Sequence, residues 1–137
     1  MEEASVVTAV DSSVLFDVLT DDPLHRGKSL AGLREARRLG ALLVCPVVWS
    51  EIRAHFAEPA EMHAAFAAAG LTFDPFDREC AELAGESWRA YRRQGGQRTR
   101  LLADFLVGSH AQARGGRLLT RDRGFYRRCF RQLQLVG

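Results

Sequence analysis

Short apolar runs alternate with longer amphipathic segments along most of this chain. The short runs are rich in Val and Leu and lack the polar alternation of half-buried strands, so we expect β-strands that are covered on both faces. The expected strands are 6–10, 41–45, 71–73, 117–120 and 133–136.

The longer segments carry apolar residues at intervals of three and four, which is typical of helices with one buried face. Asp22, which precedes Pro23, and Asp77 each stand where a carboxylate would cap the first turn of a helix. Pro46 also opens a helix, which Pro59 ends or interrupts. The expected helices are 13–19, 23–39, 46–56, 61–69, 78–93, 101–113 and 125–130, with a break at 94–97.

Strands separated by helices predict an α/β fold, because neighbouring parallel strands need a crossover connection. We expect a three-layer α/β/α sandwich with a mostly parallel central sheet. It should form a single domain over residues 1–137, since this length is too short for two ordinary domains. In such sheets the ligand site lies at the carboxyl ends of the strands. Residues that directly follow a strand are therefore candidates for the site.

The sequence carries no sign of a membrane or secreted protein. No apolar run approaches the ~18 to 20 residues of a membrane span, and the start at Met1–Glu3 is acidic, unlike a secretory signal. Cys45, Cys80 and Cys129 are far apart and lack the spacing of zinc ligands. We therefore expect a cytoplasmic protein with reduced thiols.

Charge is distributed unevenly although the net charge is only +2. Residues 1–87 carry 7 basic and 15 acidic side chains, whereas residues 88–137 carry 12 Arg and only two Asp. The second part could bind a polyanion or an acidic partner. The two parts could equally neutralise each other within the fold.

Four carboxylates occupy places where chemistry is expected. Asp11 ends the first strand, Asp122 follows a later one, Glu51 lies early in a helix, and Asp104 interrupts an apolar helical segment. Taken singly, each has an ordinary explanation: a helix cap, a turn residue, a solvated side chain and a polar helix face. Taken together, they offer the oxygen ligands that Mg²⁺ or Mn²⁺ prefers.

Four short segments resemble the motifs of PIN domains, in the same order along the chain. They are residues 10–15 (VDSSVL), 50–52 (SEI), 103–111 (ADFLVGSHA) and 118–125 (LLTRDRGF). The last two are similar to the VapC toxins of bacterial and archaeal toxin–antitoxin pairs, and the four together span nearly the whole chain. Gly108 and Ser109 stand where relatives often carry other small residues, a departure that leaves the carboxylates intact.

The resemblance implies a catalytic site in which four carboxylates hold one or two Mg²⁺ or Mn²⁺ ions. These ligands would be Asp11, Glu51, Asp104 and Asp122. The hydroxyls of Ser13 and Thr120 would support them through hydrogen bonds.

The same resemblance implies an activity and partners. The chain would be a metal-dependent endoribonuclease that leaves a 3′-hydroxyl and a 5′-phosphate, bound by a cognate antitoxin and paired with a second copy as a homodimer. Two alternatives stay open: a solitary PIN nuclease in RNA processing, and a PIN-like module that binds RNA or a partner without cleaving it.

Arginines next in sequence to the carboxylates are candidates for binding RNA phosphates, because the guanidinium group can bind a phosphate through two hydrogen bonds. Pairing with the acidic part of the chain explains them equally well. The candidates are Arg98, Arg100, Arg121 and Arg123.

Two other enzyme classes that place an Asp after the first strand fit less well. A phosphatase of the haloacid dehalogenase type needs a second Asp two residues later, where this chain has Ser13, and a downstream Lys, whereas Lys28 is the only lysine. A receiver domain also fits poorly, because this chain lacks the acidic pair and the late Lys that such a domain needs.

Overall fold

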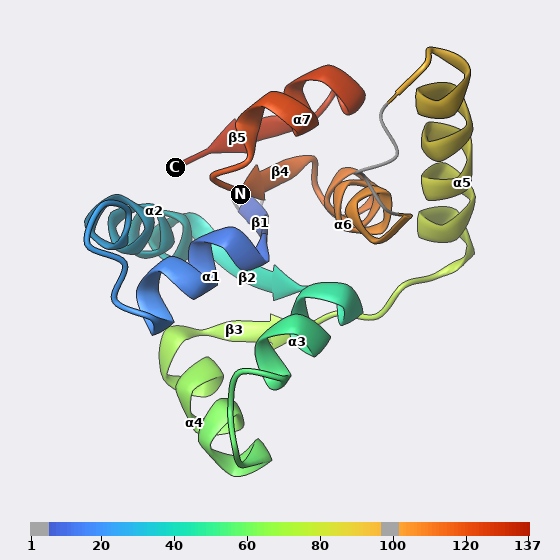
Figure 1. Ribbon diagram of the computed structural model, residues 1–137. Coiled ribbons are helices and arrows are strands. Elements are labelled where there is room, and N and C mark those ends of the chain that lie inside the picture. The colour runs from blue at the N-terminus through green and yellow to red at the C-terminus, as the bar shows by residue number, and fades with distance from the viewer. Residues whose placement is uncertain (1–5, 97–101) are drawn as a thin grey trace, which may run out of the picture.

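The computed structural model describes residues 6–96 and 102–137, and within them five parallel strands form one sheet (Figure 1). The order across the sheet is β3-β2-β1-β4-β5. The strands are β1 (Val6–Val10), β2 (Gly40–Val44), β3 (Leu71–Phe73), β4 (Arg117–Leu119) and β5 (Gln134–Val136). β1 is central, and it pairs with β2 on one side and with β4 on the other.

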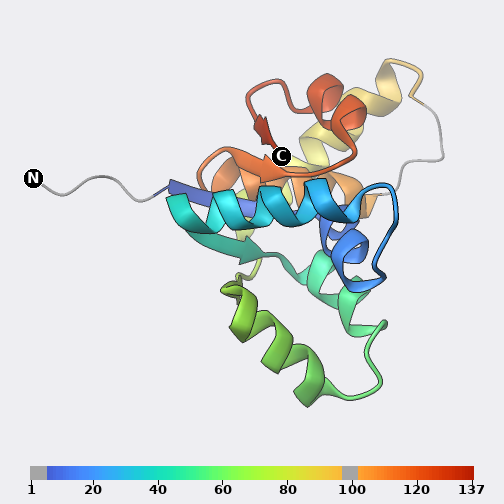
Figure 2. The ribbon, with the colours of Figure 1, turned by 90° about the vertical axis from the view of Figure 1, so that its left-hand side faces the viewer.

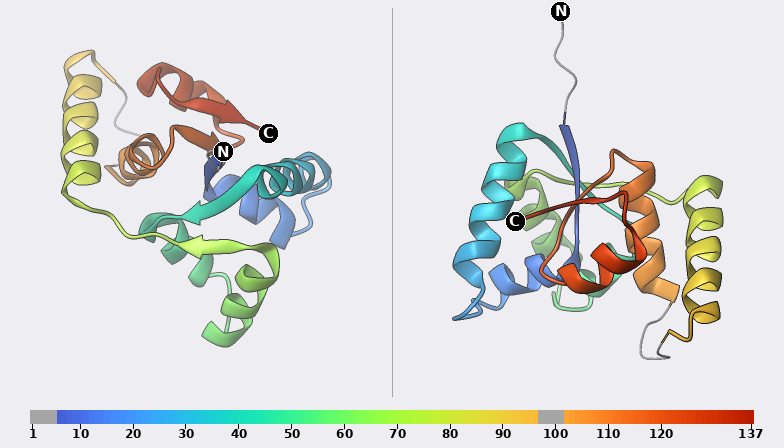
Figure 3. Two further views of the ribbon diagram at one scale, coloured as in Figure 1. Left: turned by 180° about the vertical axis from the view of Figure 1, so that it is seen from behind. Right: turned by 90° about the horizontal axis from the view of Figure 1, so that it is seen from above.

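Helices connect successive strands and cover both faces of the sheet. They are α1 (Ser12–Leu19), α2 (Arg26–Leu39), α3 (Pro46–Arg53), α4 (Pro59–Ala69), α5 (Arg78–Arg93), α6 (Leu102–Ala113) and α7 (Arg123–Cys129). Helix α2 runs across one face (Figure 2), while α6 lies on the opposite face with α5 outside it (Figure 3). The predicted three-layer α/β/α sandwich is confirmed, with every strand pairing parallel.

The start of α2 differs from the expectation that Asp22 caps a helix beginning at Pro23. The helix begins at Arg26, and the Asp22 carboxylate instead accepts hydrogen bonds from the backbone N–H groups of Leu24 and His25. An Asp side chain can stabilise a tight turn by these local bonds as readily as a helix start. The cap prediction for Asp22 was therefore wrong.

Pro59 also acts differently from its expected role at the end of a helix. Helix α3 ends earlier, at Arg53, and Pro59 is the first residue of α4. Proline fits this first position because the backbone N–H it lacks would have no partner within the helix. The helix expected over 61–69 therefore begins two residues sooner.

Phe105 of α6 lies at the centre of the core on its face of the sheet, fully buried and in contact with the rings of Trp88, Phe125 and Phe130. Close approach of α6 to this cluster depends on Gly108, where an added Cβ would lie 2.5 Å from the Phe130 ring. This packing fixes the helix that carries Asp104.

None of the helices in the described part of the chain has the length and apolar character that crossing a membrane would require. Cys45 and Cys80 are buried, and Cys129 is half-buried.

Candidate active site

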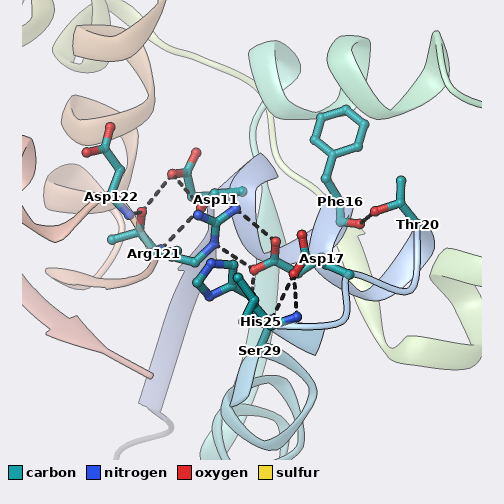
Figure 4. A network of polar contacts seen from close by, with 12 residues as sticks. Asp11, Phe16, Asp17, Thr20, His25, Ser29, Arg121 and Asp122 are labelled. Carbon is teal, nitrogen blue, oxygen red and sulfur yellow. Dashed lines mark hydrogen bonds and ion pairs between the residues drawn. The ribbon is translucent and has the colours of Figure 1, made fainter. Parts of the chain in front are cut away.

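Asp11 lies where the central strand β1 passes into α1, and its carboxylate is held by three donors. The backbone N–H of Ser12 donates to Oδ1 at 2.9 Å, which makes Asp11 the N-cap of α1. The hydroxyls of Ser13 and Thr120 donate to Oδ2 at 3.2 and 2.7 Å (Figure 4). The Asp11 side chain is buried by this arrangement and has a fixed orientation.

Burial is the largest influence on the Asp11 carboxyl, and it raises the pKa above its ordinary value. The hydrogen bonds from Thr120, Ser12 and Ser13 oppose this shift, and the negative charge of Asp122 adds to it. An ionised Asp11 is therefore short of compensating positive charge in this position.

Asp122 comes from the segment that follows β4, the strand beside β1. Its backbone N–H donates to Thr120 Oγ1 at 3.0 Å, while the same hydroxyl donates to Asp11. Thr120 thus links the two acidic residues. This proximity follows from the parallel pairing of β1 with β4, which brings their carboxyl ends to one edge of the sheet.

Glu51 and Asp104 reach the same region from two helices. Burial raises the pKa of Glu51, and the charges of Asp11 and Asp104 raise it further against a hydrogen bond from Ser12. Glu51 is nevertheless on the exposed surface of α3, and Asp104 is half-buried in the first turn of α6. The four carboxylates thus come from four separate segments and lie close enough for their charges to interact in pairs.

Tyr126 of α7 lies beside this acidic region, although its sequence context gave no reason to single it out. Its phenol is buried, which raises its pKa, and the charges of Asp11, Asp104 and Asp122 raise it further. The Cys45 thiol responds to the same surroundings, since burial and then the charges of Asp11 and Glu51 raise its pKa to about 11. Both groups are therefore protonated at neutral pH.

The donor set fits a hard divalent cation, because every candidate ligand is a carboxylate oxygen and the charges destabilise one another without a cation. Among residues 6–96 and 102–137, no three His, Cys, Asp or Glu side chains already stand together as a ligand set.

Two of the candidate RNA-binding arginines fall within the described residues. The Arg121 guanidinium binds the Asp17 carboxylate through Nε and Nη2 at 2.8 and 2.9 Å. Arg123 approaches the backbone oxygen of Gly137 and lines a cavity of about 180 Å³ next to Thr120. Arg98 and Arg100 lie outside the described residues. The RNA contacts expected of these arginines stay predictions.

Asp17 is a functional candidate that the sequence analysis missed. It is buried in α1 within an apolar stretch, residues 14–19 (VLFDVL), and it binds both Arg121 and Ser29. The signal was present, because a carboxylate among apolar residues needs a compensating partner.

The PIN domain family model matches residues 8–131, so the chain belongs to the PIN domain family, whose members are nucleases. The predicted resemblance is thereby confirmed over nearly the whole chain. Comparison with curated protein sequences gives no match.

Solved structures of VapBC and FitAcB proteins share this fold. A chain of VapBC2 from Rickettsia felis, bound to a promoter DNA fragment, has a TM-score of 0.75 at 16% identity, covering 95% of this chain and 97% of that one. VapBC-1 from nontypeable Haemophilus influenzae has a TM-score of 0.72 at 13% identity, and the match covers 95% of this chain and 96% of that one. FitAcB from Neisseria gonorrhoeae has a TM-score of 0.68 at 16% identity, with the same shares of the two chains covered. At these identities the likeness concerns the fold.

Proposed function

We propose that this chain is a Mg²⁺- or Mn²⁺-dependent endoribonuclease and the toxin of a VapBC-type toxin–antitoxin pair. The observation that carries the proposal is that, in a PIN fold, Asp11 at the end of the central strand interacts electrostatically with Asp122 and Glu51, and Glu51 in turn with Asp104. Fold and acidic site together favour phosphodiester hydrolysis over the other activities considered from the sequence.

In this proposal the metal ligands are Asp11, Glu51, Asp104 and Asp122. A bound divalent ion supplies a nucleophile at neutral pH and neutralises charge on the phosphate. The protein's own contribution is orientation: Ser12, Ser13 and Thr120 hold both oxygens of the Asp11 carboxylate. Oδ1 accepts one of these bonds and so retains a lone pair for a cation, whereas Oδ2 accepts two.

RNA is the proposed substrate because the part of the chain that carries Asp104 and Asp122 is strongly basic. Lys28 and Arg123 line the cavity beside Thr120, so positive charge lies near the acidic site. Phosphates of a bound strand would contact Arg123 and, by the sequence argument, Arg98, Arg100 and Arg121.

An antitoxin is the proposed partner because the solved structures that share the fold are toxin–antitoxin complexes. A homodimer and a cytoplasmic location belong to the same proposal. The apolar faces of α2 and α3 pack into this chain's own core, and Leu39 at the end of α2 is exposed.

The activity is tested with the purified chain, a mixed panel of RNAs, and Mg²⁺ or Mn²⁺. We expect the wild type to cleave at least one RNA and Asp11→Asn and Asp104→Asn to lose cleavage. Asp21→Asn is the matched control, because Asp21 is exposed and paired with Arg26 away from the site. Equal cleavage by wild type and D11N would point to a contaminating nuclease and remove the enzyme proposal.

The toxin role needs a separate test in cells. Expression of the wild type alone should arrest growth and generate new RNA ends, whereas D11N should do neither. Growth without arrest, combined with cleavage in vitro, would favour a solitary PIN nuclease in RNA processing. Binding of RNA without cleavage in any metal would favour a silent PIN-like module.

A further inference from the structure

A two-point ion pair joins α1 to the segment that follows β4. Arg121 Nε lies 2.8 Å from Asp17 Oδ2 and Nη2 lies 2.9 Å from Oδ1. The Asp17 side chain is only 2% exposed, whereas that of Arg121 is 44% exposed. Ser29 of α2 donates to Asp17 Oδ2 at 2.7 Å, so the buried carboxylate also holds α2 (Figure 4).

Arg121 stands between two residues of the candidate active site. Its own backbone N–H donates to Ser13 Oγ at 3.2 Å, and Ser13 Oγ donates in turn to Asp11. On one side Thr120 donates to Asp11, and on the other the Asp122 N–H donates to Thr120. The segment 120–122 is therefore fixed at its centre by the ion pair and at both ends by bonds within the site.

We propose that Asp17 and Arg121 are positioning residues, whose ion pair holds segment 120–122 so that Thr120 and Asp122 keep the placement around Asp11 that cation binding requires. This inference rests on the proposed function, since it takes the four carboxylates to be a metal site. It gives Arg121 a role in addition to the RNA contact expected from the sequence.

The geometry favours positioning over simple stabilisation. Ion pairs that are partly exposed contribute little to stability, and replacing even a buried pair by apolar residues is often neutral, so this half-exposed pair is weak evidence for a stability role. A guanidinium bound to a carboxylate at two points fixes both distance and plane, which a single charge cannot do. Lysine could supply the charge at position 121 but not the two-point geometry.

Asp17→Asn is the first variant to test. It removes the charge, the new amide oxygen can still accept from Ser29, and Arg121 stays half exposed and hydrated, so the fold should persist. Three quantities are measured on the full chain: Mn²⁺ affinity by titration, amide hydrogen exchange at residues 121 and 122, and kcat and KM for RNA cleavage. We expect Mn²⁺ affinity and kcat to fall ~10- to 100-fold, with faster exchange at both amides and little change in KM.

Arg121→Lys and Arg121→Gln should behave alike in Mn²⁺ affinity, because both lose the two-point contact. Arg127→Gln is the matched control for loss of an exposed arginine, and it should keep wild-type Mn²⁺ affinity and exchange. Wild-type affinity and exchange in D17N or in R121K would overturn the inference. A wild-type chain that cleaves no RNA would count against the proposed function alone, since metal binding and amide exchange still decide the role of the pair.

Discussion

The Thr120 hydroxyl donates a 2.7 Å hydrogen bond to Asp11 Oδ2 across 109 positions of sequence. Neighbouring parallel strands place these residues side by side, and Asp122 is tied to the same hydroxyl through its backbone. One side chain therefore sets the relation between two of the proposed metal ligands.

Thr120→Val should reduce RNA cleavage ~10- to 100-fold, the usual effect of losing a hydrogen bond that orients a metal ligand. Valine keeps the shape of threonine but cannot donate to Asp11 or accept from Asp122. Rates are measured with saturating Mn²⁺, and Thr72→Val, on the exposed side of β3, is the control. An unchanged rate in T120V would show that the Asp11 orientation does not depend on this bond.

Mn²⁺ should stabilise the folded chain, because the proposed ligands gather only in the folded state. At about a hundredfold excess over Kd, the free energy of unfolding should rise by ~2.7 kcal/mol. The rise should disappear after chelation and should be absent or much smaller in Asp11→Asn. Urea unfolding with and without Mn²⁺ gives both values, and an equal rise in D11N would place the ion elsewhere.

The buried His110 should make stability depend on pH between neutrality and mild acid. Burial lowers the pKa of His110 below its ordinary 6.5, despite the opposing hydrogen bond to Asp74. The unfolded chain then binds a proton near pH 6.5 that the folded chain does not, so stability falls as pH falls below that value. His110→Gln should lose this part of the pH dependence, as measured by Tm from pH 7.5 to 4.5.

His63→Gln is the control for that series, because His63 is exposed on α4. A Tm profile of H110Q that runs parallel to that of the wild type would contradict the assignment to His110.

The Asp74 carboxylate affects stability in a more acidic pH range. Burial alone would raise its pKa, but hydrogen bonds from His110 and Arg114 outweigh this and lower it below 3.8. Its contribution is present above pH 3.8 and is lost as pH falls through the lower folded value.

Phe105→Ala should lower the free energy of unfolding by about 3 to 5 kcal/mol, since it removes a fully buried ring from the aromatic cluster. Leu102→Ala on the same helix should cost far less, because Leu102 is exposed. Urea denaturation followed by circular dichroism measures both. Similar losses in the two variants would mean that α6 is held mainly by other contacts.

The sequence predicts the strands and the three layers well, because strands covered on both faces appear as continuous apolar runs. The starts of α2 and α4 were misplaced for a local reason: Asp22 and Pro59 each suit two neighbouring structures, and the choice depends on tertiary packing. The four carboxylates could be singled out because strands and motifs mark them. Asp17 could not be assigned a partner, since nothing local connects it to Arg121.

Pairing of the central strand with β4 also has a consequence during synthesis. Ala9 and Val10 align with Leu118 and Leu119, so the sheet edge that carries Asp11 is complete only when β4 has been made. A nascent chain still lacking that part has no Thr120 or Asp122 beside Asp11. Chemistry that depends on all of these groups is therefore withheld until the segment from β4 to Asp122 has been synthesised.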